Sequence, residues 1–225
     1  MRGNYMLEKI SAMSHALYSY DKNGLNYLDV KNLSLFPSGL LGKVVYSTKR
    51  SSAAATMAML LRGIKEDTNN NDGAFVREFQ YNQKILRGAP WCGSFVNWCY
   101  NPTHEVNKNI FGLDDIAVSS SQTLKREAKK RGYWASKDSG YKPQKGDLVI
   151  WTDIENPSRG HVGIVSKVQS NGSITVIHGN FDDAVVEKKY RTIKDMEVAG
   201  DNPNSTNKLA GFIRLSDYYN RHIYI

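Results

Sequence analysis

The chain is poor in cysteine, and it has no long apolar run. Only two of its 225 residues are cysteines, which excludes a disulfide framework and a cysteine-rich zinc site. No apolar run approaches the length of a membrane span. The first residues lack the apolar core of a secretory signal, so we expect a protein that is made in the cytoplasm and not exported by the general route.

The composition is that of a folded, basic protein. Hydrophobic residues make up 40% of the chain, enough for a packed core. The net charge is +8 and the pI about 9.3. A basic surface suits a polyanionic partner such as nucleic acid, anionic lipid or a bacterial cell wall. Charge alone does not choose among the three.

The stretch from Gly88 to Tyr100 runs from a loop into a helical pattern. Pro90 suits a first helical turn, and aromatic residues recur behind it at helical spacing, so we expect one buried face. Cys92 then lies in the first turn, where free backbone N–H groups and the helix dipole favour a thiolate. Cys99 lies about 10 Å further along the helix, too far for a disulfide, and we expect it in the core.

A candidate base follows about 70 residues later. Residues 145–151 read as a turn into an apolar strand, and 160–165 as a second strand that opens with His161. A lone Cys is more often a buried core residue, and a lone His at a strand start is usually structural. Their combination in this order is more specific: W-C-x-x-F-V, then G-D-L-V-I-W, then G-H-V-G-I-V.

Over residues 73–214 this combination resembles the CHAP family (cysteine, histidine-dependent amidohydrolase/peptidase), a papain-like branch close to the NlpC-type cell-wall hydrolases. The resemblance implies an α+β fold, with helices followed by a small antiparallel sheet and the nucleophile at the start of a buried helix. It implies a cysteine hydrolase acting on peptidoglycan, with no metal or organic cofactor.

The order of elements agrees with that layout, with an extension over 1–50 and a catalytic domain over 51–225. We predict helices over 5–19, 51–66, 74–86 and 122–131, and strands over 147–151, 161–168, 173–178, 184–190 and 209–215. Asp67, Asn69 and Asn71 have the spacing of a calcium loop, but Gly73 comes one place late, which favours a solvated loop. The basic run within 125–131 is best interpreted as a solvated helix face.

The hairpin over 161–178 predicts which side chains face His161. A two-residue Asn171-Gly172 turn would place Gly163 opposite Asn180 and His161 opposite Asp182. His161, His178, Asn180 and Asp182 would then share one face of the sheet, unless a bulge intervenes.

A catalytic histidine needs a partner that orients its ring. In the CHAP family the following strand often reads Glu-Gly-Asn; here it reads His178-Gly179-Asn180. We therefore predict a Cys92, His161, Asn180 site with Asp182 as the alternative third member, while His178 is a structural residue or a substrate contact. Trp91 and Trp151 are further candidate substrate contacts.

The implied mechanism is acyl transfer through the Cys92 thiolate. The backbone N–H of Cys92 would hold the oxyanion, and His161 would protonate the leaving amine. The second oxyanion donor is not identified; Gln80, Tyr81 and Gln83 are candidates.

The leading hypothesis is a peptidoglycan amidase or endopeptidase that acts in the periplasm or wall of a target cell. A type VI secretion effector is favoured over a phage lysin, with a cognate immunity protein and a secretion-machine component as partners and no nucleic acid. A cysteine protease or deamidase toxin with a protein substrate is the alternative. A wall- or nucleic-acid-binding module with a vestigial site is the non-enzymatic reading.

Overall fold

The computed structural model describes residues 50–101, 110–111, 119–199 and 204–221. The predicted extension and its helix over 5–19 lie outside these residues. Helices come first in the chain and strands follow, as predicted. The helices are α3 (Arg50–Leu60), α4 (Ala74–Asn82), α5 (Cys92–Tyr100), α6 (Ser121–Lys130) and α7 (Leu215–Arg221), with a 3₁₀ turn η2 at Lys194–Met196. The strands are β1 (Trp134–Ser136), β2 (Leu148–Asp153), β3 (Gly160–Val168), β4 (Ile174–Phe181), β5 (Ala184–Tyr190) and β6 (Asn207–Ile213).

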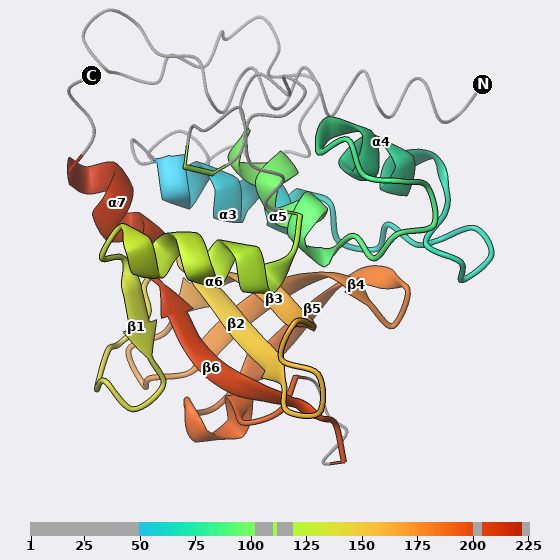
Figure 1. The fold of residues 1–225 in the computed structure, drawn as a ribbon. Helices are drawn as coiled ribbons and strands as arrows, with labels where there is room; N and C mark the ends of the chain where they lie inside the picture. Colours follow the sequence, from blue (N-terminus) through green and yellow to red (C-terminus); the bar gives the residue numbers. More distant parts are fainter. Residues whose placement is uncertain (1–49, 102–109, 112–118, 200–203, 222–225) are drawn as a thin grey trace, which may run out of the picture.

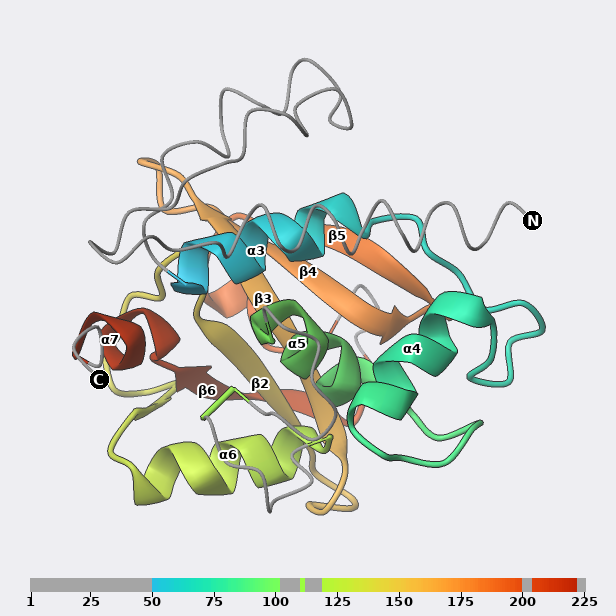
Figure 2. The same ribbon diagram turned by 90° about the horizontal axis from the view of Figure 1, so that it is seen from above.

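The strands form one antiparallel sheet in the order β1-β6-β2-β3-β4-β5. The helices lie on one side of it (Figure 1), and α3 and α5 cross over its central strands (Figure 2). All five predicted strands are present. The short strand β1 was not predicted, because three residues carry too little alternation to stand out.

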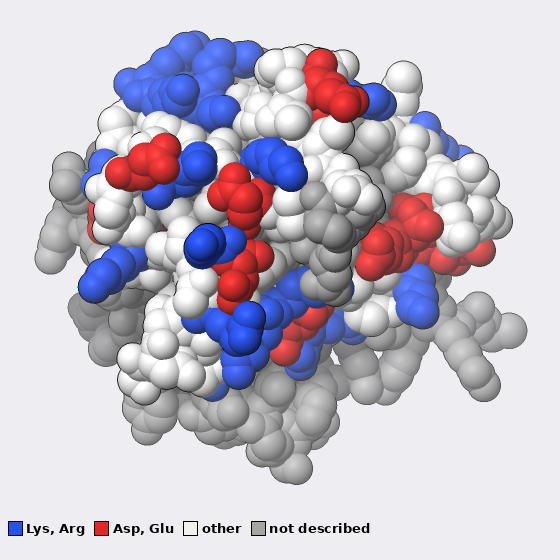
Figure 3. Space-filling model, turned by 90° about the horizontal axis from the view of Figure 1, so that it is seen from below, with Lys and Arg blue, Asp and Glu red and all other residues white. Residues whose placement is uncertain are grey.

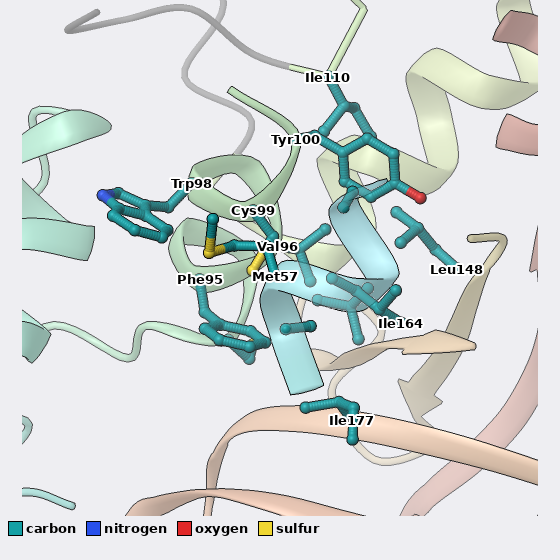
Figure 4. Packing of buried hydrophobic residues seen from close by; sticks show 14 of the residues in the cluster. Met57, Phe95, Val96, Trp98, Cys99, Tyr100, Ile110, Leu148, Ile164 and Ile177 are labelled. Carbon is teal, nitrogen blue, oxygen red and sulfur yellow. The ribbon is translucent and has the colours of Figure 1, made fainter. Parts of the chain in front are cut away.

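The main core lies between the helices and the sheet. All nine residues of α5 are buried, and its apolar side chains meet Met57 of α3 and Ile164 and Ile177 of the sheet (Figure 4). Small residues on α3, including Ala54 and Ala58, are fully buried, which lets α3 pack closely against its neighbours. This packing fixes the helix that carries Cys92.

A second core cluster covers the opposite face of the sheet. It contains Val149, Trp151 and Tyr190 together with Met196 from the 3₁₀ turn. Because neighbouring strand residues face opposite sides, β3 contributes to both clusters. His161 shares the face of Trp151, whose ring centroid lies 5.8 Å from its own.

Two predicted helices end earlier than expected, and one is close to its predicted bounds. The helix predicted over 51–66 ends at Leu60, and the one predicted over 74–86 ends at Asn82. Helix α6 is capped by the Ser120 side chain, which accepts from the Gln122 N–H, and it ends just before Gly132 in a left-handed conformation (φ 74°).

The predicted register of the β3–β4 hairpin is wrong by two residues. Gly163 pairs with His178 instead of Asn180. The turn has three residues, since the Gln169 N–H bonds the Ser173 carbonyl and Gly172 adopts φ 83°. A bulge between Val165 and Lys167 adds the second one-residue shift. An even total shift leaves the faces unchanged, so His161 and His178 still share one face, as predicted.

Candidate active site

Cys92 is the first residue of α5, and the protein holds this helix end firmly. Trp91, the N-cap, is fully buried and donates its indole N–H to Glu66 Oε1 at 2.8 Å. Its ring stacks on Phe79 of α4. Phe95 packs edge-on against both rings. The start of α5 is therefore anchored by an aromatic cluster and a buried carboxylate.

Cys92 lines a pocket of about 310 Å³. Gly93 makes room for one wall of it, because a Cβ at Gly93 would lie 1.9 Å from the Ser119 carbonyl oxygen. Cys92 is only 8% exposed and belongs to the main core cluster, but it also lines this cavity. The lining residues are Ile85, Ala89, Pro90, Cys92, Ser119, Ser120, Ser121, Arg159 and Gly160.

The expected low pKa of Cys92 is a prediction that the structure corrects. Burial raises the pKa of the Cys92 thiol above its ordinary value. Backbone N–H groups of Gly93, Val162 and Cys92 itself act in the opposite direction without outweighing burial. The resting group is therefore a thiol, and its contact with the Val162 N–H places the sulfur beside the residue that follows His161.

His161 is the second residue of β3 and follows Gly160, which lines the Cys92 pocket. Its Nε2 lies 3.0 Å from His178 Nδ1, and the two ring planes differ by only 14°. Burial lowers the pKa of His161 to about 4, so the ring is neutral at pH 7. In the described part of the chain no hydrogen bond joins the Cys92 thiol to this ring; the thiol instead contacts the N–H of Val162, the next residue of β3.

The hydrogen-bonded chain continues beyond His178. His178 Nε2 lies 3.3 Å from the Tyr190 hydroxyl on β5. Burial, together with the charges of His161 and Lys188, holds the pKa of His178 well below its ordinary value. If His161 donates from Nε2 to His178 and His178 donates from Nε2 to Tyr190, then His161 Nδ1 is left able to accept a proton.

Asn180 and Asp182 do not hold the orienting position predicted for them. Asn180 adopts φ 54° and donates its amide to Asn71 Oδ1 at 2.9 Å. Asp182 is exposed and, like His161, lines a separate pocket of about 590 Å³. The β3–β4 register is shifted by two residues from the predicted one, and the β4–β5 pairing is irregular between His178 and Phe181. His178 therefore lies beside His161 instead.

The structure places the three predicted substrate contacts inside the protein. Trp91, Trp151 and His178 each have a relative exposure of 0%. Trp151 donates its indole N–H to the Met196 carbonyl at 2.8 Å. Their polar atoms are used inside the protein, so they support the site from behind.

None of the three candidates for a second oxyanion donor points its donor group into the Cys92 pocket. Gln80 is buried and donates its amide to the Asn71 and Ala89 carbonyls. Gln83 donates to Asn82, and Tyr81 is 67% exposed. Gln80 instead fixes the loop that leads into α5.

Sequence reasoning missed two residues that shape the site. Glu66 accepts from the Trp91 indole and from the Asn71 N–H, and so joins the helix start to the 67–73 loop. No motif marks this residue. Tyr190 could have been predicted, because it ends a predicted strand that pairs with the strand of His178.

The 67–73 loop closes on itself through its own side chains. The Thr68 N–H and hydroxyl both donate to the Asp72 carboxylate, and these bonds lower the pKa of Asp72. Across the described residues, no group of three or more His, Cys, Asp or Glu side chains could hold a metal ion. In the same part of the chain, no helix is long and apolar enough to cross a membrane.

Comparison with known families agrees with the motifs. Residues 85–180 match the model of the CHAP domain family. The match contains Cys92, His161 and His178, and it ends at Asn180. Searches of curated proteins and of solved structures gave no match. Residues 85–180 are therefore a CHAP domain, and this domain implies a cysteine hydrolase of the amidase/peptidase class.

Proposed function

We propose that this protein hydrolyses an amide bond of peptidoglycan, with Cys92 as nucleophile, His161 as base and acid, and His178 as the residue that orients His161. The observation that carries the assignment is the 3.0 Å contact between His161 Nε2 and His178 Nδ1. It occurs at the strand end that meets the Cys92 pocket. The CHAP family match supports the wall as substrate.

The reaction starts from two neutral groups. His161 Nδ1 takes the thiol proton as the sulfur attacks the amide carbonyl carbon, and the tetrahedral oxyanion is held by the free N–H of Cys92 at the helix start. The C–N bond then breaks, and His161 returns the proton to the leaving amine. A water molecule, deprotonated by His161, hydrolyses the thioester and regenerates the thiol.

Proton transfer accompanies attack in this scheme, because burial disfavours both the thiolate and the imidazolium. The thiol–imidazole hydrogen bond is made as substrate fills the pocket, since catalytic hydrogen bonds often tighten only in the substrate complex. His178 holds the His161 ring in the required tautomer throughout.

Delivery to a target cell is the finer part of the proposal. As an antibacterial effector or a lysin, the protein must leave the cytoplasm in which it is made in order to reach peptidoglycan. An effector also requires an immunity protein that blocks the Cys92 pocket. Expression with and without a periplasmic signal tests this. Toxicity that appears only with the signal supports it, whereas toxicity from the cytoplasm alone points to another target.

The reaction itself is tested on purified sacculi. We expect soluble fragments with new amine ends from the wild type and none from Cys92→Ala, with mass spectrometry identifying the cleaved bond. Intact sacculi together with cleavage or deamidation of a protein substrate would replace the proposal with the protein-directed alternative.

A further inference from the structure

Helix α6 carries two groups of basic residues in different surroundings. One group surrounds Glu127, which is 3% exposed and lies within 4 Å of cationic atoms of Arg126, Lys130 and Arg131. These contacts lower the pKa of the Glu127 carboxyl. Glu127 therefore offsets one of the three positive charges of this group.

The other group has no acidic partner in the part of the chain that the structure describes. Lys125 and Lys129, one helical turn apart, both lie over the indole ring of Trp134, with Nζ 5.6 and 5.8 Å from its centroid. No carboxylate of the described residues lies within salt-bridge distance of either. Lys125 Nζ instead donates to the Thr152 hydroxyl, and burial and the charge of Lys129 lower the pKa of Lys125.

Two like charges at this spacing repel each other, so the arrangement favours an anion that bridges them. Figure 3, which views the molecule from below, shows a dense group of Lys and Arg atoms at the upper left, while blue and red atoms are interspersed over the rest of that face.

The start of α6 lines the Cys92 pocket, and Trp134, beneath the two lysines, lines a second hollow. Ser120 and Ser121, at the start of α6, line the Cys92 pocket. Trp134 also lines a second pocket of about 490 Å³, together with Tyr141 and Arg214. The Arg214 guanidinium lies over the Tyr141 ring, 6.0 Å from its centroid. A polymer could thus run from the thiol along α6 to an aromatic and cationic hollow.

We propose that Lys125 and Lys129, held over the Trp134 ring, bind the carboxylates of a peptidoglycan strand whose scissile amide lies at Cys92. This surface, the α6 track, rests on the proposed function and adds a polymer-binding site to it. Carboxylates complement the two lysines, which have no acidic partner among the described residues. The track selects polymeric wall over short fragments.

The test compares two double variants, each of which removes two lysine charges. Lys125→Gln/Lys129→Gln removes the track charges, and Lys167→Gln/Lys189→Gln removes two exposed lysines from β3 and β5. Binding to sacculi freed of teichoic acid is measured by pelleting in a Cys92→Ala background, at low and high salt. Hydrolysis of sacculi and of a soluble muropeptide is measured with Cys92 present.

We expect the track pair to weaken sacculus binding by about fivefold or more at low salt, and less at high salt. Muropeptide hydrolysis should change by less than about twofold, and the β3/β5 pair should behave as wild type. Equal losses in both pairs, no loss in the track pair, or binding only to walls that keep teichoic acid or only to DNA would overturn the α6 track. Failure of the wild type to cut any peptidoglycan would instead overturn the proposed function.

Discussion

The two ends of helix α5 carry one cysteine each, and the two cysteines differ in everything but burial. Cys92, at the first turn, meets backbone N–H groups and lines a pocket. Cys99, near the last turn, is fully enclosed among apolar side chains such as Val96 and Met57 (Figure 4). Burial raises the pKa of both thiols, and it raises that of Cys99 further.

In the proposed mechanism, position on the helix, more than exposure, separates the nucleophilic thiol from the packing one. A helix start supplies N–H groups that no carbonyl of the helix uses, and these can hold a developing oxyanion. Seven residues later the N–H groups are used within the helix. A cysteine at the start of α5 can therefore act as a nucleophile beside these N–H groups, whereas a cysteine near its end only fills space in the core.

The largest expected effect comes from exchanging the two cysteines for alanine or serine. Cys92→Ala should reduce sacculus hydrolysis by about a thousandfold or more, because no other described thiol lines the pocket. Cys99→Ser should leave the rate within about threefold but cost about 1–3 kcal/mol of stability, since it buries a hydroxyl in an apolar site. Turnover assays and urea denaturation separate the two, and equal loss of activity in both variants would contradict the comparison.

The next effect concerns what orients the base. His178→Ala should lower the hydrolysis rate by about a hundredfold, because His161 loses the partner of its Nε2. Asn180→Ala, the matched variant two residues along, removes only the bond to Asn71 and should lower the rate by less than about fivefold. Urea denaturation of both variants controls for folding. A larger loss for Asn180→Ala would restore the order that the sequence suggested.

The difference between His178 and Asn180 shows which part of the site could be predicted from the sequence and which could not. The motifs around Cys92 and His161 have regular spacing and local cues, so the helix start, the strand order and the shared face were predictable. The third member depended on the hairpin register. A three-residue turn and a bulge, each a one-residue choice, moved His178 into the place assigned to Asn180. Neither choice leaves a firm signal in the sequence.

The Cys92 pKa failed as a prediction for a related reason. The helix start was placed correctly, but its effect competes with desolvation, which depends on how the 119–121 segment and β3 close over the thiol. Those segments are distant in sequence. The local sequence pattern predicts the helix start, which lowers the thiol pKa. The desolvation that raises this pKa depends on tertiary packing, which the local pattern does not reveal.

Acid pH should affect both activity and stability through the buried histidines. His161 must be neutral to act as a base, so kcat/KM should fall as the pH falls through about 4, below the ordinary histidine range. Between about 6.5 and 4 the unfolded chain binds the proton and the folded one does not. Unfolding free energy should therefore decrease on acidification, by about 3 kcal/mol for His161 alone. An acid limb near 6.5 in the rate profile would contradict this burial.

The smallest expected effect tests the far end of the hydrogen-bonded chain. Tyr190→Phe keeps the ring but removes the oxygen beside His178 Nε2, so the tautomer that frees His161 Nδ1 is less favoured. We expect a rate loss of about three- to tenfold, with a change in the ¹⁵N shifts of both histidines. Tyr141→Phe is the matched control, because its hydroxyl bonds Asp147 away from the site and its loss should affect stability alone. If the two variants lower the rate equally, with unchanged histidine shifts, then Tyr190 only packs, and the orientation of His161 ends at His178.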